Sequence, residues 1–205
     1  MITIINYGLG NISAFSNMYK RMNIETKVAT SVADLVHASR ILLPGVGAFD
    51  HAMELLQSSG MRPRLEELVL SHKVPVLGVC VGMQMLADSS EEGRLPGLGW
   101  VRGRVRSFRS EPRSATLPLP HMGWNDVTPV KADSCLFAGL ESHARFYFLH
   151  SFFFECAHSD AIGASARYGL DFSCAVNSGN VNGVQFHPEK SHQYGALLLK
   201  NFAKS

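Results

Sequence analysis

The sequence predicts an α/β fold of three layers, with a mostly parallel central sheet flanked by helices and an added antiparallel β portion in the C-terminal half. Two observations favour this fold. Up to Leu86, short apolar runs that suit buried strands alternate with segments of helical spacing, and this order indicates a parallel sheet with right-handed crossovers. From Trp100 onward, apolar residues alternate with period two, which is typical of strands that pair mostly antiparallel.

The N-terminal half carries the signals of the parallel sheet. Its apolar, β-branched runs predict strands at residues 2–5, 26–29, 40–43 and 75–80. The intervening patterns predict helices at 12–22, 32–38, 50–57 and 61–72, with a further helical segment after residue 82. Asn6, Tyr7 and Asn11 follow the first strand, and we expect them to be exposed at the strand ends, where ligands or partners meet α/β sheets.

The C-terminal half reads mainly as strands. These are predicted at residues 100–106, 122–127, 145–154, 162–168, 173–176 and 181–186, and a final helix at 194–202. Residues 88–99 and 110–119 are expected to be loops, because they are polar or interrupted by proline. At 205 residues the chain is long enough for one sizeable core, so residues 1–205 are predicted to form a single domain.

Composition argues against several classes of function. Nineteen Lys and Arg against 17 Asp and Glu give a net charge of +2, too balanced to indicate binding to nucleic acid or to an anionic membrane. The N-terminus lacks a secretory leader, and no apolar run approaches the ~20 residues of a membrane-spanning helix. Four cysteines without Cys-x-x-Cys spacing fit a reducing compartment, so we expect a soluble cytoplasmic protein.

One basic cluster stands out against this balance. It consists of Arg102, Arg104, Arg106 and Arg109. The alternation of its first members predicts the solvated face of a strand, and a contact with phosphate or a partner is the alternative.

A cysteine between two glycines is the first candidate catalytic residue. Gly78-Val79-Cys80-Val81-Gly82 follows an apolar strand and precedes a helical segment, the form of the Gly-x-Ser-x-Gly turn that presents a nucleophile. The glycines permit close backbone approach and strained angles. A helix N-terminus would favour the reactive thiolate. A buried structural cysteine in a glycine-rich turn is the alternative.

Two further motifs lie at the ends of predicted strands. Pro44-Gly45-Val46-Gly47 predicts a loop whose backbone N–H groups suit an oxyanion hole, although a plain strand–helix turn has the same pattern. In His187-Pro188-Glu189, the imidazole and the carboxylate project to the same side, because alternate residues of an extended chain do so. A histidine oriented by a carboxylate is the base half of a Cys-His-Glu triad, whereas alone it would be read as a turn histidine.

Neither a nucleotide cofactor nor a metal is predicted. The turn Gly8-Leu9-Gly10 follows the first strand, but Ser13 stands where the phosphate-binding fingerprint requires its third glycine. The spacing of the cysteines argues against a structural zinc site.

Together these motifs resemble those of the class I glutamine amidotransferases. The resemblance rests on residues 44–47, 78–84 and 185–191, and it extends over the whole chain. Three further motifs, at 6–11, 120–125 and 147–151, look like those of the glutaminase subunits of imidazole glycerol phosphate synthases.

The resemblance implies a glutaminase mechanism without a cofactor. Cys80 would attack the side-chain amide of glutamine, and His187, oriented by Glu189, would protonate the departing ammonia and then activate water to hydrolyse the γ-glutamyl thioester. The oxyanion would be held by backbone N–H groups of Val46, Gly47 and Val81. The amino-acid part of glutamine would be bound by Gln84, His150 and Ser151.

The resemblance also implies a partner. Ammonia would pass to a TIM-barrel synthase subunit, in a heterodimer that makes imidazole glycerol phosphate and aminoimidazole carboxamide ribotide for L-histidine biosynthesis. The docking face would include Asn11, Met122, Trp124, Asn125 and Lys190. A peptide flip in the loop at 45–47 would complete or dismantle the oxyanion hole and so switch the glutaminase.

The sequence leaves three alternatives open. One is a free-standing cysteine γ-glutamyl hydrolase or peptidase, which would need Cys80 and His187 but not the motifs at 6–11 and 121–125. Another is a non-enzymatic binding subunit with a decayed site, against which the intact triad argues. The third is a paralogous subunit that supplies ammonia for the amidation of surface sugars.

Overall fold

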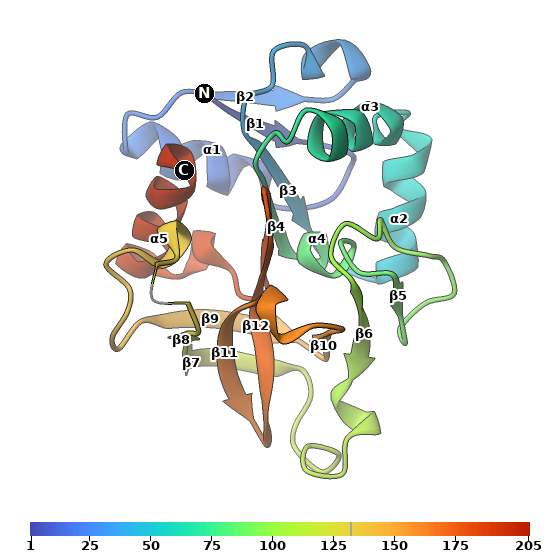
Figure 1. Cartoon of the computed structure of the whole chain (residues 1–205), viewed down its shortest axis with the longest axis vertical. Coiled ribbons are helices and arrows are strands. Elements are labelled where there is room, and N and C mark those ends of the chain that lie inside the picture. Colours follow the sequence, from blue (N-terminus) through green and yellow to red (C-terminus); the bar gives the residue numbers. More distant parts are fainter. Residues whose placement is uncertain (132) are drawn as a thin grey trace.

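A mixed β-sheet runs through the centre of the computed structural model, which describes residues 1–131 and 133–205 (Figure 1). One half of the sheet is parallel, in the order β2 (Thr26–Ala29), β1 (Ile2–Ile5), β3 (Ile41–Gly45), β4 (Val76–Cys80) and β13 (Val181–Val184). The apolar runs of the sequence explain these positions, because strands covered on both faces must be apolar throughout. Every residue of β1, β3 and β4 is buried.

The other half of the sheet is mostly antiparallel. It continues through β12 (Leu170–Ser178), β10 (Phe152–Cys156) and β6 (Gly103–Ser107) to the short edge strand β5 (Ser89–Ser90), while β11 (Ile162–Tyr168) and β8 (Thr128–Pro129) pair beside β12. A separate antiparallel pair is formed by β7 (His121–Asp126) and β9 (Arg145–His150). The added antiparallel portion predicted for the C-terminal half is confirmed.

Helices cover both faces of the parallel half (Figure 1). On one side lie α1 (Ile12–Arg21) and α5 (His192–Lys204), and on the other α2 (Phe49–Ser58) and α3 (Arg62–Glu66). α1 begins after Asn11, whose side-chain oxygen accepts a hydrogen bond from the Ala14 N–H at 3.2 Å. The three-layer α/β fold is confirmed. Across the described residues, each helix is too short or too polar to span a membrane.

Several predicted elements differ in extent, and two of them differ in kind or number. The helix expected at 32–38 is a single 3-10 turn, η1 (Val32–Leu35), after which Val36 is extended. The strand expected at 145–154 is two strands, because the chain breaks at Ser151 and β9 and β10 pair with different neighbours. The remaining short elements are α4 (Val81–Gln84), the π turn η2 (Glu67–Ser71), and the 3-10 turns η3 (Phe108–Ser110), η4 (Cys135–Phe137), η5 (Ser159–Ala161) and η6 (Pro188–Lys190).

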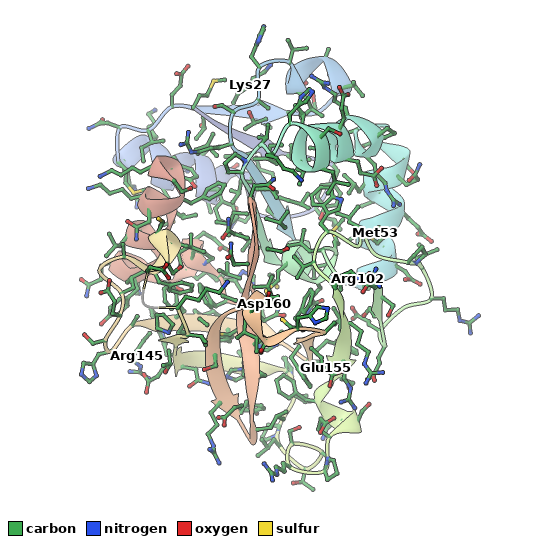
Figure 2. All side chains as sticks on the ribbon, in the orientation of Figure 1. Lys27, Met53, Arg102, Arg145, Glu155 and Asp160 are labelled. Atoms are coloured by element: carbon green, nitrogen blue, oxygen red, sulfur yellow. The ribbon has the colours of Figure 1, made fainter. Side chains whose placement is uncertain are left out.

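Three arginines of the basic cluster on and beside β6 are paired with carboxylates, and the fourth, Arg109, donates to the carbonyl oxygens of Ala115 and Leu117. Arg104 and Arg106 both bind Glu155 on β10, at 2.7 Å and 3.0 Å, and Arg102 binds Asp88 at 2.9 Å. Figure 2 labels Arg102 and Glu155 on this side of the molecule. These ion pairs agree with the predicted solvated strand face and give no support to a phosphate site.

Candidate active site

Three adjacent strands bring the sequence motifs together. β3 and β13 flank β4 in parallel, with Gly45 opposite Cys80 and Val184 opposite Val79. The segments that leave the carboxyl ends of these strands therefore emerge side by side. They carry the loop at 46–47, the cysteine turn and the His-Pro-Glu motif, which lie far apart along the chain.

Cys80 occupies a strained turn between β4 and α4. Its φ of 56° and ψ of −115° are unusual for a residue with a side chain, and it is 5% exposed. Both flanking glycines are required by close backbone approach. A Cβ on Gly82 would lie 2.0 Å from the Leu43 carbonyl oxygen, and one on Gly78 would lie 2.6 Å from that of Gly82. The predicted strand–turn–helix form of this motif is confirmed.

The helix after Cys80 is shorter than its sequence pattern indicates. α4 has only four residues, Val81–Gln84, so few peptide dipoles are aligned toward the thiol. The dipole of so short a helix therefore stabilises a thiolate only weakly. The side chains around the sulfur matter more for its reactivity.

His187 lies between the thiol and a carboxylate. Its Nδ1 is 2.8 Å from Glu189 Oε1, and the two side chains are 7% and 4% exposed. Burial lowers the pKa of His187, but Cys80 and Glu189 outweigh this effect and raise the pKa to about 10. The imidazole is therefore protonated at neutral pH, as its ion pair with Glu189 requires.

Ser191 fixes the histidine, and the sequence analysis did not single it out for this role. It is fully buried, and its hydroxyl donates to the His187 carbonyl oxygen at 2.6 Å and accepts from the Tyr147 N–H at 3.0 Å. The His187 N–H donates in turn to the Tyr147 carbonyl oxygen at 2.8 Å. Because serine is common before a helix, its position ahead of α5 gave no distinctive signal.

A cavity of about 270 Å³ lies over Cys80. It is lined by Cys80 and His187, by the predicted oxyanion residues Val46, Gly47 and Val81, by the predicted substrate residues Gln84, His150 and Ser151, and by Glu92, Pro120, Leu149 and Phe152. Glu189 instead lines a neighbouring cavity of about 310 Å³, which shares Val46 and His187 with the first.

Gln84 is held by two hydrogen bonds from its amide nitrogen. Nε2 donates to Gln185 Oε1 at 3.0 Å and to the Phe152 carbonyl oxygen at 3.4 Å. The amide orientation is thereby fixed, and Oε1 is the group that Gln84 can offer to a ligand. Gln185 donates through its own Nε2 to Cys80 Sγ at 3.9 Å.

Both ring nitrogens of His150 are engaged inside the protein. Nδ1 lies 2.7 Å from the Phe152 carbonyl oxygen, which can only accept, so Nδ1 carries the proton. Nε2 lies 2.9 Å from His121 Nδ1 and accepts from it. Burial lowers the pKa of His150 to about 3 and that of His121 to about 4, so both rings are neutral. A ligand in the cavity would therefore meet the backbone of His150 rather than its ring nitrogens.

Glu92 is a cavity residue that the sequence analysis missed. Its Oε2 accepts a hydrogen bond from the Phe49 N–H at 2.9 Å, and burial, followed by the charge of Asp50, raises its pKa. It belongs to the polar segment 88–99, which was predicted only as a loop. No local pattern distinguishes it from the acidic residue beside it.

The five residues expected at a docking face lie in three places. Met122 and Trp124 are 64% and 39% exposed on one face of β7, where the Trp124 ring stacks on His192 with centroids 5.3 Å apart. Asn11 and Lys190 line the cavity of about 310 Å³. Asn125 lies on the opposite face of β7 and donates to the Arg167 carbonyl oxygen at 2.9 Å.

Within the part of the chain that the structure describes, no group of three or more His, Cys, Asp or Glu side chains is arranged to hold a metal ion.

The sequence matches a known family along nearly its whole length. The family model "Glutamine amidotransferase class-I" covers residues 4–205. The chain belongs to the class I glutamine amidotransferase family. Relatives of this amidotransferase include the imidazole glycerol phosphate synthase subunit HisH of Bdellovibrio bacteriovorus, 65% identical over 204 residues and the full length of both chains. The protein of the same name from Leptospira interrogans is 49% identical over 203 residues, or 99% of each chain.

Solved structures agree on the fold of this amidotransferase. A crystal structure described as a glutamine amidotransferase superposes with a TM-score of 0.75, covering 99% of this chain and 97% of the other at 20% identity. At that identity the likeness concerns the fold alone. The full-length curated relatives place the chain among the HisH subunits, as the motifs at 6–11, 120–125 and 147–151 predicted.

Proposed function

We propose that this chain hydrolyses L-glutamine to L-glutamate and ammonia at the Cys80 cavity and supplies the ammonia to a TIM-barrel synthase subunit. The observation that carries the proposal is the convergence on one cavity of a thiol, the loop at 46–47 and an imidazole that is held by a buried carboxylate. This convergence occurs in a chain whose relatives are named as subunits of imidazole glycerol phosphate synthase.

The first half of the reaction forms a thioester. Cys80 Sγ attacks the side-chain carbonyl carbon of glutamine, and the negative charge that develops on the carbonyl oxygen is stabilised by backbone N–H groups of Val81 and the 46–47 loop. His187 gives its proton to the amide nitrogen, the C–N bond breaks, and ammonia leaves. The raised pKa of His187 supports this role, because the ring holds a proton when the substrate arrives.

The second half releases glutamate. His187, now neutral, takes a proton from water, and the hydroxide formed attacks the thioester carbonyl carbon. The C–S bond then breaks, Cys80 returns as the thiolate, and His187 is protonated again. Glu189 does not transfer a proton in this scheme. It holds the ring by Nδ1 and stabilises its charged form.

The cavity suits the amino-acid end of glutamine. Glu92 and the Gln84 Oε1 atom are both acceptors, which match the three N–H donors of an α-ammonium group. The Ser151 segment, on the wall formed by residues 149–152, offers hydroxyl and backbone donors for the α-carboxylate. At about 270 Å³ the space fits a single small amino acid better than a peptide, which argues against the peptidase alternative.

The second cavity, which shares two lining residues with the first, supports the passage of ammonia toward a partner. It begins behind His187 and Val46 and reaches Asn11 and Lys190, both exposed. The Glu189 Oε2 atom is buried there without a hydrogen-bond partner among the described residues. The exposed Trp124 and Met122 on β7 provide an apolar surface for docking. The Trp124 ring contacts that of Tyr147, over which Lys190 Nζ lies.

The test is glutamine hydrolysis by the purified chain, alone and with the barrel synthase subunit encoded in the same genome and its nucleotide ligand. We expect slow hydrolysis alone, a large increase in the complex, and synthesis of imidazole glycerol phosphate from glutamine. A high rate that the partner leaves unchanged would favour a free-standing hydrolase. Activation without imidazole glycerol phosphate synthesis would favour a paralogous pathway.

A further inference from the structure

Tyr7 is buried, and the expectation that it would be exposed is wrong. It follows β1 and is 5% exposed. Because β1 pairs in parallel with β3, the chain leaving β1 lies next to the end of β3. The Tyr7 hydroxyl donates to the Pro44 carbonyl oxygen at 2.8 Å and lies 3.5 Å from Met85 Sδ.

The Tyr7 hydroxyl therefore joins the two segments that supply the proposed oxyanion donors. Pro44 belongs to β3 just before the 46–47 loop, and Met85 is the residue at which α4 ends. Burial raises the pKa of Tyr7, and the nearby Cys80 raises it further. The hydroxyl thus stays protonated, and remains a donor, throughout the pH range in which such an enzyme works.

The base of the oxyanion loop is also crowded by backbone. A Cβ added at Gly45 would lie 2.5 Å from the Gly82 nitrogen and 3.1 Å from the Tyr7 hydroxyl oxygen. Gly45 is therefore held between the cysteine turn and the tyrosine, with no space for a side chain.

The tip of the loop is different. Val46 is 47% exposed, and a Cβ on Gly47, whose φ is +93°, would meet nothing within 4 Å among the described residues. The loop is therefore held up to Gly45, the residue after the Pro44 carbonyl group that Tyr7 binds, and it is open from Val46 onward.

We propose that Tyr7 is a positioning residue for the oxyanion hole, which fixes the Pro44–Gly45 peptide against the cysteine turn. The backbone up to Gly45 is then held at a constant distance from Cys80, and reorientation is confined to the peptide groups that follow, whose N–H groups belong to Val46 and Gly47. This inference rests on the proposed glutaminase function. Its physical basis is that oxyanion donors accelerate a reaction only when they are held in place before charge develops.

The test compares Tyr7→Phe with Tyr19→Phe. Each variant loses one buried hydroxyl group and keeps the ring. Tyr19, on α1, is 0% exposed, and its hydroxyl has no hydrogen-bond partner among the described residues, so it is a matched control away from the cavity. Steady-state hydrolysis of L-glutamine and alkylation of Cys80 by iodoacetamide are measured for both, the latter by mass spectrometry of the Cys80 peptide.

Tyr7→Phe is expected to lower kcat for glutamine about tenfold, with KM changed less than about twofold, because oxyanion donors act mainly in the transition state. Alkylation of Cys80 should keep its rate, since displacement at a saturated carbon develops no oxyanion. Tyr19→Phe should leave all three quantities within about twofold of the wild type.

Two results would overturn the inference while leaving the proposed function intact. One is glutamine turnover by Tyr7→Phe equal to that of Tyr19→Phe. The other is a parallel loss of turnover and of Cys80 alkylation, which would indicate general disruption of the site. A wild-type chain that hydrolyses no glutamine, even with its barrel partner, would overturn the proposed function, and this inference with it.

Discussion

The wall of the cavity that carries Cys80 and the wall that carries Val46 are built in opposite ways. Around Cys80 the backbone is packed so closely that a Cβ added at Gly82 would lie only 2.0 Å from the Leu43 carbonyl oxygen. On the other wall Val46 is 47% exposed, and Gly47 faces open space. The nucleophile is therefore held in one geometry, whereas the tip of the oxyanion loop can change its conformation.

This difference indicates where activity can be controlled. A strained, packed nucleophile keeps its geometry whatever happens at the surface. A peptide flip limited to residues 46–47 would add or remove oxyanion donors without moving Cys80. Control of the glutaminase by a docked partner would then act on the open wall alone.

Alanine at Gly82 and at Gly47 compares the two walls most directly. For Gly82→Ala, the backbone of β3 must shift to admit the new Cβ, so the free energy of unfolding should fall by about 3 kcal/mol or more. For Gly47→Ala, the left-handed φ of +93° is the only penalty, about 1 kcal/mol. Urea denaturation at neutral pH measures both. Equal losses for the two variants would show that the walls do not differ in packing.

The paired histidines His121 and His150 should destabilise the protein in acid. The pKa values of His121 and His150 are lowered to about 4 and about 3, so the unfolded chain takes up their protons first as the pH falls below about 6.5. Between pH 7 and pH 5 we expect each histidine to reduce the free energy of unfolding by about 2 kcal/mol.

His187 contributes with the opposite sign. Its folded pKa is raised to about 10, so its stabilisation is fully present below about pH 6.5 and is lost as the pH rises through about 10. NMR titration of the imidazole protons distinguishes His121 and His150, whose pKa values are lowered, from His187, whose pKa is raised. The signals of His121 and His150 should not titrate above pH 5, and midpoints near 6.5 would contradict the neutral hydrogen-bonded pair.

Substitution of Glu92, which lines the cavity, is expected to have a smaller effect. Glu92→Gln keeps the shape of the side chain but removes the charge that we propose for the α-ammonium group. KM for glutamine should rise about tenfold while kcat changes less than about twofold, because this contact is equal in the ground and transition states. Steady-state kinetics with L-glutamine provides the measurement.

Glu91→Gln is the matched control for that change. Glu91 binds the Ser107 N–H at 2.8 Å and an arginine of β6, and it is not part of the cavity wall. Its kinetics should equal those of the wild type. A fall in kcat for Glu92→Gln with KM unchanged would place Glu92 in the chemical step instead of in binding.

Sequence patterns predicted the parts of the site that depend on local signals. The apolar strands and the motifs at their ends, Pro-Gly-x-Gly, Gly-x-Cys-x-Gly and His-Pro-Glu, were predicted from neighbouring residues alone. These motifs lie close together because their strands are adjacent and parallel in the sheet. Strict alternation in β7 also carried a signal that went unused: Asn125, next to Trp124, had to lie on the other face.

The rest of the site depends on contacts between distant segments. The hydrogen bond from Tyr7 to Pro44 spans 37 positions and that between His121 and His150 spans 29, and no local pattern records either. Glu92 enters the cavity because its loop packs against the first residue of α2. The helix after Cys80 was overestimated, because apolar spacing continues past Gln84 although the chain forms only a turn at residues 85–86.

Glutamine hydrolysis by Cys80→Ala in the complex with the barrel subunit tests whether Cys80 is the nucleophile. Cys174→Ala is the control, since Cys174 is also buried, in β12, with no place in the cavity. The account predicts that Cys80→Ala loses glutaminase activity by about a thousandfold or more, while partner binding and synthesis from added ammonia persist, and that Cys174→Ala stays active. Hydrolysis by Cys80→Ala at the rate of Cys174→Ala would contradict it.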